Sequence, residues 1–204
     1  MARRTKDEAE KTRNTILDAA EKVFYKHGVT RTSLEQVARA AGVTRGAVYW
    51  HFKDKIELCE AMLQRVFLPQ EDVLDRLAAE PSRTPLDDLK KACCNALRLM
   101  ATDKRRHRVA SILTNRCEYV EEMEAIMRRR RLCKDHMLER SLILFKHARK
   151  LKQLEPGWTP RLAAMSLQAL MSGLIASGIE RRKGFDLVKS APACIDAFFE
   201  SLKA

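Results

Sequence analysis

The sequence is poor in residues that interrupt regular structure, with 7 glycines and 6 prolines among 204 residues. Alanine, leucine, lysine, arginine and glutamate, which dominate instead, are all good helix formers. No stretch alternates apolar and polar residues with period two, as a half-buried strand would. The sequence therefore predicts an all-α fold of about nine helices.

Motifs of catalysis and metal binding are also missing. No metal-ligand spacing relates the five histidines, which are His27, His51, His107, His136 and His147. Neither a glycine-rich phosphate loop nor a nucleophile motif is present. We therefore expect no enzyme activity, no metal and no cofactor.

The cysteines form no C-x-x-C pair and no regular framework. There are six, Cys59, Cys93, Cys94, Cys117, Cys133 and Cys194. The first six residues, Met-Ala-Arg-Arg-Thr-Lys, are charged and no apolar stretch follows them, so no signal peptide is expected. Reduced thiols in a cytoplasmic protein are the preferred interpretation.

One stretch, residues 162–179, is apolar enough to raise the question of a membrane span. It contains Gln168, Ser166, Ser172 and Ser177, and it barely reaches spanning length. A helix that is buried on two sides inside protein fits it better, so we expect no membrane partner.

The charge balance is strongly positive. Lysine and arginine total 39 against 27 acidic residues, which gives a formal net charge of +12. That surplus favours a polyanionic partner such as nucleic acid or an anionic membrane surface. Charge alone does not decide the partner, because many basic proteins are merely soluble.

Apolar residues at three- and four-residue spacing outline the helices. We expect helices near residues 8–27, 33–42, 44–50, 54–68, 86–101, 104–115, 120–151, 160–179 and 194–202. Residues 1–8 are expected to form a flexible basic arm, Pro69 to end the fourth helix, and Pro192 to lie in the last connection. The sequence divides into a domain of residues 1–55 and a domain of residues 56–204, with helix 54–68 linking them.

Residues 33–52 have the layout of a helix-turn-helix. Ser33 to Gln36 has the form of a capping box, Gly42 can take the positive φ angle that reverses the chain, and Thr44 is a good N-cap for the second helix. The second helix would then enter the major groove of DNA with its N-terminal end leading.

The exposed residues of this second helix suit DNA. Thr44, Arg45 and Gly46 lie at the leading end, where Arg45 could bridge guanine O6 and N7 and Gly46 would let the DNA backbone approach. The residues expected to contact phosphates and thymine methyls, or to hold the DNA backbone on either side, are Tyr49, Trp50, His51, Ser33, Lys53 and Lys55. The alternative is that the three large rings are core residues. We accept it for Phe52. For Tyr49 and Trp50 we favour contact with DNA, since a helix this short cannot bury three large rings.

The run Thr32-Ser33-Leu34-Glu35-Gln36-Val37-Ala38, followed by Ala41-Gly42-Val43-Thr44-Arg45-Gly46-Ala47-Val48-Tyr49-Trp50-His51-Phe52-Lys53-Asp54-Lys55, resembles the DNA-binding signature of the TetR family. Residues 2–6, 12–13 and 16–20 resemble its AcrR-type branch, as do residues 116–119 and Met123. The dense match covers about the first quarter of the chain.

That resemblance implies a homodimer whose two N-terminal domains bind the half-sites of a palindromic double-stranded DNA operator. It also implies a larger domain that binds small hydrophobic or amphipathic inducers, such as antimicrobials, and releases the DNA. AcrR-type members typically repress multidrug efflux pump operons. The alternative is a non-regulatory basic protein that binds nucleic acid or another partner by charge.

The last two long helices would form the dimer as a four-helix bundle with the partner's pair. The candidate interface residues are Leu162, Met165, Ala169, Leu170, Gly173, Leu174, Ile195, Phe198, Phe199 and Leu202. An intramolecular core explains the same apolar pattern, and the family resemblance favours the dimer.

An inducer pocket should be apolar with a few polar anchors. The candidates, on helices that surround the pocket in similar proteins, are Phe67, Leu97, Met100, Leu113, Thr114, Met137, Ser141, Gln168 and Met171. Taken alone, each is more simply explained as a core residue than as part of a pocket. Gln168 is the most informative, because a buried amide needs hydrogen-bond partners. No acid is strongly placed in this set.

Two basic runs, residues 104–108 and 128–131, remain open. The first could attract DNA at long range or transmit the inducer signal. The default for both is a solvated helix face.

Overall fold

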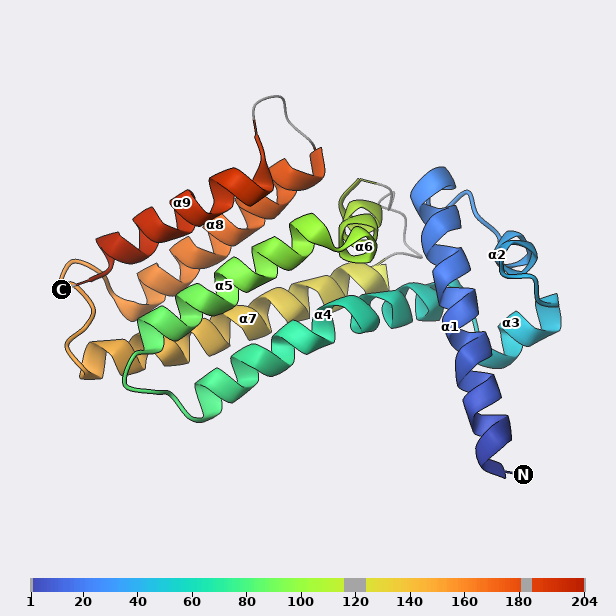
Figure 1. The fold of residues 1–204 in the computed structure, drawn as a ribbon, viewed down its shortest axis with the longest axis horizontal. Helices are drawn as coiled ribbons and strands as arrows, with labels where there is room; N and C mark the ends of the chain where they lie inside the picture. The colour runs from blue at the N-terminus through green and yellow to red at the C-terminus, as the bar shows by residue number, and fades with distance from the viewer. Residues whose placement is uncertain (1, 116–123, 181–184, 204) are drawn as a thin grey trace. The chain divides into compact units, whose positions relative to one another are not determined.

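The computed structural model describes residues 2–115, 124–180 and 185–203. All regular secondary structure in these ranges is helical, which confirms the all-α prediction (Figure 1). The helices are α1 (Ala2–His27), α2 (Leu34–Ala41), α3 (Arg45–His51), α4 (Lys55–Ala79), α5 (Pro85–Thr102), α6 (Lys104–Asn115), α7 (Glu124–Lys150), α8 (Pro160–Glu180) and α9 (Leu187–Ser201). The family resemblance at residues 116–119 and Met123 lies outside the described residues.

The N-terminal segment is helical, so the prediction of a flexible arm over residues 1–8 was wrong. Helix α1 begins at Ala2 and continues without a break to His27. Residues 2–10 contain no glycine or proline and several strong helix formers, so nothing stops the helix from extending beyond its apolar face. The buried apolar face of α1 begins only at Ile16. Because the residues before it show no apolar periodicity, the sequence did not indicate a helix there.

Two prolines lie inside helices instead of ending them. Helix α4 continues through Pro69 to Ala79, and α9 begins at Leu187 and passes through Pro192. A proline removes one backbone hydrogen bond, but packing on both sides can offset that loss. In α4, Val66 precedes Pro69 and Ala78 follows it, and both are buried.

The contacts within the chain divide it into two compact units, and the predicted domain boundary at residue 55 stays a prediction. Unit 1 comprises Met1–Val66 and Arg108–Arg129, and unit 2 comprises Phe67–His107 and Arg130–Ala204. Unit 1 extends to Val66 because the first three turns of α4 are packed into it through apolar residues. Leu58, Met62 and Val66 are each at most 2% exposed.

In unit 1, α1 packs on α2 and α3, and α2 packs on α3. Ile16, Leu17 and Phe24 of α1 are fully buried, and Val48 of α3 is buried with them. A short helix such as α3 is marginal alone, so this packing holds it in place. Unit 1 therefore presents a fixed α3 whose other side is free to meet a partner.

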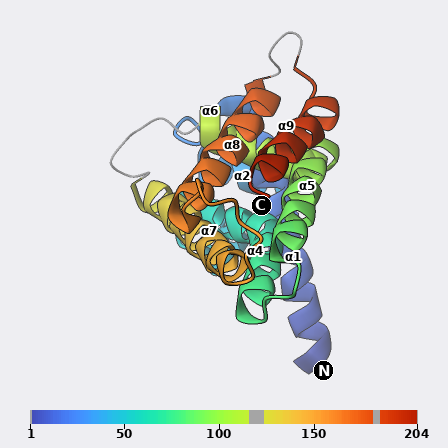
Figure 2. The ribbon, with the colours of Figure 1, turned by 90° about the vertical axis from the view of Figure 1, so that its left-hand side faces the viewer.

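In unit 2, α5 packs against α8 and α9, and α8 packs against α9 (Figures 1 and 2). The fully buried side chains include Leu89, Leu144, Phe145, Ile195 and Phe199. The segment after α7 is joined to the C-terminal end by a backbone hydrogen bond from Glu155 to the Leu202 carbonyl, 2.8 Å long. These contacts make the larger unit a helical bundle with a continuous core.

Candidate nucleic-acid interface

The turn before α2 and the turn before α3 have the predicted capping geometry. The Gln36 backbone N–H donates to the Ser33 hydroxyl at 3.2 Å, and the Gln36 side chain accepts from the Ser33 N–H at 2.8 Å. Gly42 follows α2 with φ +69°, the left-handed conformation that glycine adopts without strain. The capping box and the glycine turn are both confirmed.

Thr44 caps α3, as predicted. Its hydroxyl oxygen accepts from the Ala47 N–H at 3.1 Å. A hydroxyl that accepts one hydrogen bond keeps its own hydrogen for donation outward, and the same holds for Ser33. Both residues are exposed, so each cap presents a donor that a phosphate oxygen can accept.

Helix α3 divides its large rings between core and solvent. Phe52, directly after α3, is 1% exposed, which confirms its predicted place in the core. Tyr49 is 47% exposed and Trp50 is 73% exposed. The core alternative is therefore wrong for these two rings, and their contact with DNA remains a prediction.

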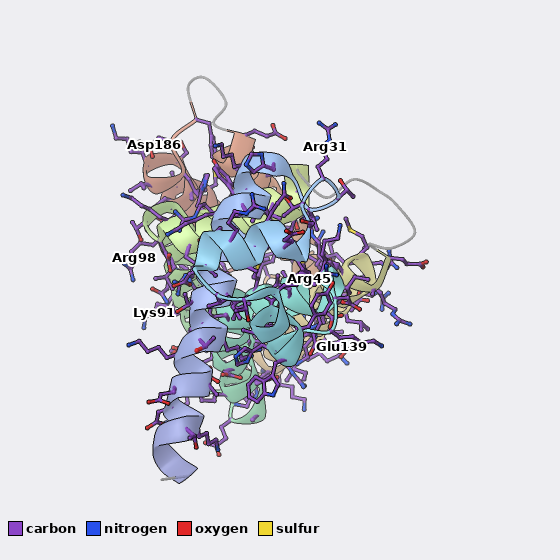
Figure 3. The ribbon with its side chains drawn as sticks, turned by 90° about the vertical axis from the view of Figure 1, so that its right-hand side faces the viewer. Arg31, Arg45, Lys91, Arg98, Glu139 and Asp186 are labelled. Atoms are coloured by element: carbon purple, nitrogen blue, oxygen red, sulfur yellow. The ribbon has the colours of Figure 1, made fainter. Side chains whose placement is uncertain are left out.

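Arginines lie against two of these rings. The guanidinium carbon of Arg45 lies 5.3 Å from the centre of the Tyr49 ring, one helical turn away. Such a cation–π contact restricts where the guanidinium can lie. Arg45 on α3 and Arg31 in the turn between α1 and α2 are both exposed (Figure 3). Sequence reasoning missed Arg13 of α1, which lies 5.2 Å from the centre of the Phe52 ring.

The two lysines after α3 differ in their contacts. Lys53 is exposed, and its backbone N–H donates to the Glu57 carboxylate at 2.6 Å, beside the Asp54 cap of α4. The Lys55 ammonium donates to the backbone carbonyls of Val29 at 3.4 Å and Thr30 at 3.2 Å. Lys55 thus supports the turn after α1. An ammonium has three hydrogens to donate, and the contact of Lys55 with the DNA backbone stays a prediction.

His51 lies at the end of α3 and is partly buried. Burial lowers the pKa of its imidazole below the ordinary value of 6.5, and the positive charge of Arg13 lowers the pKa further, against an opposing effect of Glu10. Neutral imidazole therefore dominates at pH 7. In this state His51 can still donate or accept a hydrogen bond at a phosphate.

The basic run at residues 104–108 is not a uniformly solvated face. Its helix, α6, is capped by Asp103, which accepts from the backbone N–H groups of Arg105 at 2.8 Å and Arg106 at 3.3 Å. Arg108, at the end of the run, pairs with the buried carboxylate of Glu21. In the second run, Arg128 and Arg131 are exposed, as expected.

The predicted pocket residues lie on several helices, and the two units divide them. Leu97, Met100, Leu113 and Ser141 are buried; Thr114, Met137, Gln168 and Met171 are partly exposed; the Phe67 side chain lies outside the described residues. The Gln168 amide donates to the Lys134 carbonyl at 2.7 Å, and the Ser141 hydroxyl donates to the Met137 carbonyl at 2.9 Å. Each polar anchor thus has a partner, and their assembly into one pocket remains a prediction.

The predicted dimer-interface residues divide between exposed positions and the chain's own core, and their role in a dimer stays a prediction. On α8, Leu162 is 48% and Met165 is 51% exposed, and Ala169 and Gly173 continue this exposed face, with Leu170 partly exposed beside it. Four other candidates, Leu174, Ile195, Phe199 and Leu202, are buried in the chain's own core. Phe198 is partly exposed and packs edge-on against Trp158 at 5.8 Å. Sequence periodicity shows that a helix has an apolar face but not which partner covers it.

Helix α8 is also long and apolar enough to cross a membrane, with a mean hydropathy of 1.6 over a window that is 28% buried. The expected burial of this helix on two sides inside protein stays a prediction, because a second copy could cover its exposed side. Within the described ranges, no group of three or more His, Cys, Asp or Glu side chains could hold a metal ion.

Two family profiles match the chain. The one described as "Bacterial regulatory proteins, tetR family" matches residues 16–62, and the one described as "MAATS-type transcriptional repressor, C-terminal region" matches residues 84–204. The chain is 37% identical over 198 residues to the HTH-type transcriptional regulator AcrR of Shigella flexneri, which covers 94% of this chain and 89% of that protein.

Solved structures are similar over nearly the full length. NalD, the secondary repressor of the MexAB-OprM multidrug efflux pump in Pseudomonas aeruginosa, is 39% identical with a TM-score of 0.85, covering 97% of this chain and 98% of that one. The SmeT–triclosan complex is 32% identical with a TM-score of 0.87, covering 95% of this chain and 92% of that one.

Proposed function

The chain belongs to the TetR family of bacterial transcriptional regulators, and we propose that it is a ligand-responsive repressor of a multidrug efflux pump operon. It is a DNA-binding regulator and not an enzyme. The observation that carries the proposal is the exposed face of α3. There, Arg45, Tyr49 and Trp50 lie in solvent beside a capping hydroxyl, on a helix that its buried Val48 holds in place.

This face can read and grip duplex DNA by two kinds of contact. Arg45 and Gly46 at the leading end of α3 would face the base edges in the major groove. Ser33, Thr44, Tyr49, Trp50, His51 and Lys53 would position the protein on phosphates and thymine methyls. The net charge of +12 adds attraction that does not depend on base sequence.

A homodimer follows from the need to bind two half-sites at once. The exposed apolar stripe Leu162, Met165, Ala169 and Gly173 on α8 supports this arrangement, since burying it against a second copy removes it from water. Partly exposed Phe198 on α9 lies in the same unit. A stripe this apolar also accounts for the hydropathy of α8 without a membrane.

Small hydrophobic molecules would act as inducers. The SmeT–triclosan complex shows one relative with such a molecule bound, and the chain covers most of that protein. In unit 2, the candidate lining from Leu97, Met100, Met137 and Met171 is apolar and adaptable, as suits promiscuous binding. A cytoplasmic location follows from its role on DNA.

The proposal is tested by selecting duplexes from a random-sequence pool with the purified full-length chain at near-physiological salt. We expect a palindromic operator, bound at least about 1,000-fold more tightly than unrelated DNA. Adding triclosan, and then a panel of hydrophobic antimicrobials and dyes, should release the operator. Binding to all duplexes alike, with affinity that vanishes as salt rises, would favour the non-regulatory basic protein instead.

A further inference from the structure

A buried carboxylate in unit 1 is bound by arginines from two other helices. Glu21 of α1 is 1% exposed. One of its oxygens accepts from Arg108 of α6, with nitrogen–oxygen distances of 2.6 and 2.7 Å, and the other accepts from Arg65 of α4 at 3.4 Å. Arg65 also pairs with Asp18 of α1 at 2.8 Å.

This cluster cannot be a solvated surface pair. Taking a carboxylate out of water is unfavourable unless opposite charges and hydrogen bonds replace the lost hydration. Removing either arginine leaves the buried carboxylate with one positive partner instead of two, so the position of each arginine matters to Glu21. In contrast, Asp18 is 44% exposed and can exchange its partner for water.

The two arginines lie where their helices pass between the units. Unit 1 ends at Val66 on α4, one residue after Arg65, and resumes on α6 at Arg108 itself. Pro69 lies one turn after Arg65 and has no N–H to donate to its carbonyl, so α4 lacks a backbone hydrogen bond beside the cluster. A displacement of α4 or α6 would therefore change the contacts of Glu21.

We propose that Glu21 is a positioning residue for operator binding, whose carboxylate, shared by Arg65 and Arg108, holds α1 to α4 and α6 in the DNA-binding form. This inference rests on the proposed function and names a residue that positions the operator-binding helices. Helix α1 packs on α2 and α3, so the charge cluster fixes the support of the DNA-reading helix. Operator affinity then depends on the contacts of Glu21 with Arg65 and Arg108.

The experiment compares operator affinity of full-length variants by fluorescence anisotropy, on a duplex selected by the wild-type chain. Arg108→Met should weaken binding at least tenfold, and Arg108→Lys should restore most of it. Lys104→Met is the matched control, because it removes the same charge from an exposed residue of the same helix and should change affinity less than threefold. Denaturant unfolding checks that each variant is folded.

Two further readouts separate positioning from direct contact with DNA. If Arg108 bound a phosphate, its loss would reduce the salt dependence of log Kd by about one unit of slope, whereas lost positioning leaves the slope unchanged. Glu21→Gln should weaken binding like Arg108→Met, and the double variant should be no weaker than the weaker single variant.

Unchanged operator affinity in folded Arg108→Met, a reduced salt slope, or additive effects in the double variant would each overturn the inference. Failure of the wild-type chain to select any operator would instead overturn the proposed function, so the two failures are distinguishable.

Discussion

The exposed faces of α3 and α8 differ in chemistry, although both leave large apolar side chains in solvent. On α3, the rings of Tyr49 and Trp50 carry a hydroxyl and an indole N–H, and the Thr44 hydroxyl lies at the start of the same helix. On α8, Leu162 and Met165 offer no hydrogen-bond donor. Donors suit a phosphate backbone, whereas an aliphatic stripe is stabilised only by excluding water. Exposed apolar area indicates a partner, and the polar atoms that accompany it indicate which kind.

The largest effect should come from placing a charge on the α8 stripe. Met165→Asp should separate the dimer, because the carboxylate would be taken out of water in an apolar interface. Operator affinity should then fall by at least about 100-fold, since the second half-site is no longer bound intramolecularly. Light scattering and anisotropy measure the two effects.

Leu132→Asp on α7 is the control for that variant. Leu132 is 55% exposed against 51% for Met165, so the two substitutions start from similar exposure. The Leu132 variant should remain dimeric. A dimeric Met165→Asp with wild-type operator affinity would show that the α8 stripe has no partner, and the contrast with α3 would be lost.

The next effect concerns how α3 reads bases. Arg45→Ala should cost about 1–3 kcal/mol of operator binding and relax the preference at one position of each half-site. Tyr49→Phe keeps the ring beneath the guanidinium and removes only the hydroxyl, so base preference should persist with a loss of about 1 kcal/mol or less. Binding to a set of single-base operator variants measures both. An unchanged base preference in Arg45→Ala would show that Arg45 does not read a base, and α3 would then contribute only contacts that position the protein on DNA.

A substitution at Gly46 should affect protein stability and DNA binding in opposite directions. A Cβ there would meet only the Thr44 hydroxyl at 3.9 Å, so Gly46→Ala should raise the free energy of unfolding by up to about 1 kcal/mol. Operator affinity should nevertheless fall, because the methyl group occupies the space that the DNA backbone needs.

Gly42→Ala makes the opposite comparison, since a positive φ strains alanine and should cost about 1–2 kcal/mol of stability. Thermal unfolding and operator titration of the two variants together test the assignment. Equal operator affinity in Gly46→Ala and the wild type would remove Gly46 from the interface.

The smallest effect is a pH dependence through His51. Its pKa lies below 6.5 in the free protein, and a neighbouring phosphate would raise it, so binding takes up a proton as the pH falls. Operator affinity should therefore increase between pH 7.5 and 6, by less than tenfold per pH unit. His51→Gln should remove that part of the dependence, and an identical pH profile in the variant would place His51 away from phosphates.

Local signals in the sequence predicted the parts of the structure that local chemistry determines. The caps at Ser33, Thr44 and Asp54 each join groups three residues apart, so they can be recognised from spacing alone. The helix order and the turn at Gly42 follow from the same kind of signal.

Contacts between distant segments were not predictable in this way. Glu21 and Arg108 are 87 residues apart, and the Lys55 ammonium meets carbonyls 25 and 26 residues upstream. Only the assembled fold shows that these charges are engaged. The apolar residues of α9 were likewise identifiable, but whether they face their own core or a second copy depends on packing that periodicity does not encode.

The side chain that caps α3 at Thr44 suits a negatively charged partner as well as the start of a helix. Aspartate and asparagine cap helices at least as well as threonine, so the fold alone would tolerate either residue at this position. An aspartate, however, would accept the Ala47 N–H with a negative charge and offer a nearby phosphate only repulsion. Of two side chains that cap a helix equally well, the hydroxyl is thus compatible with a nearby polyanion and the carboxylate is not. Folding therefore accepts either a hydroxyl or a carboxylate at position 44, whereas DNA binding favours the hydroxyl.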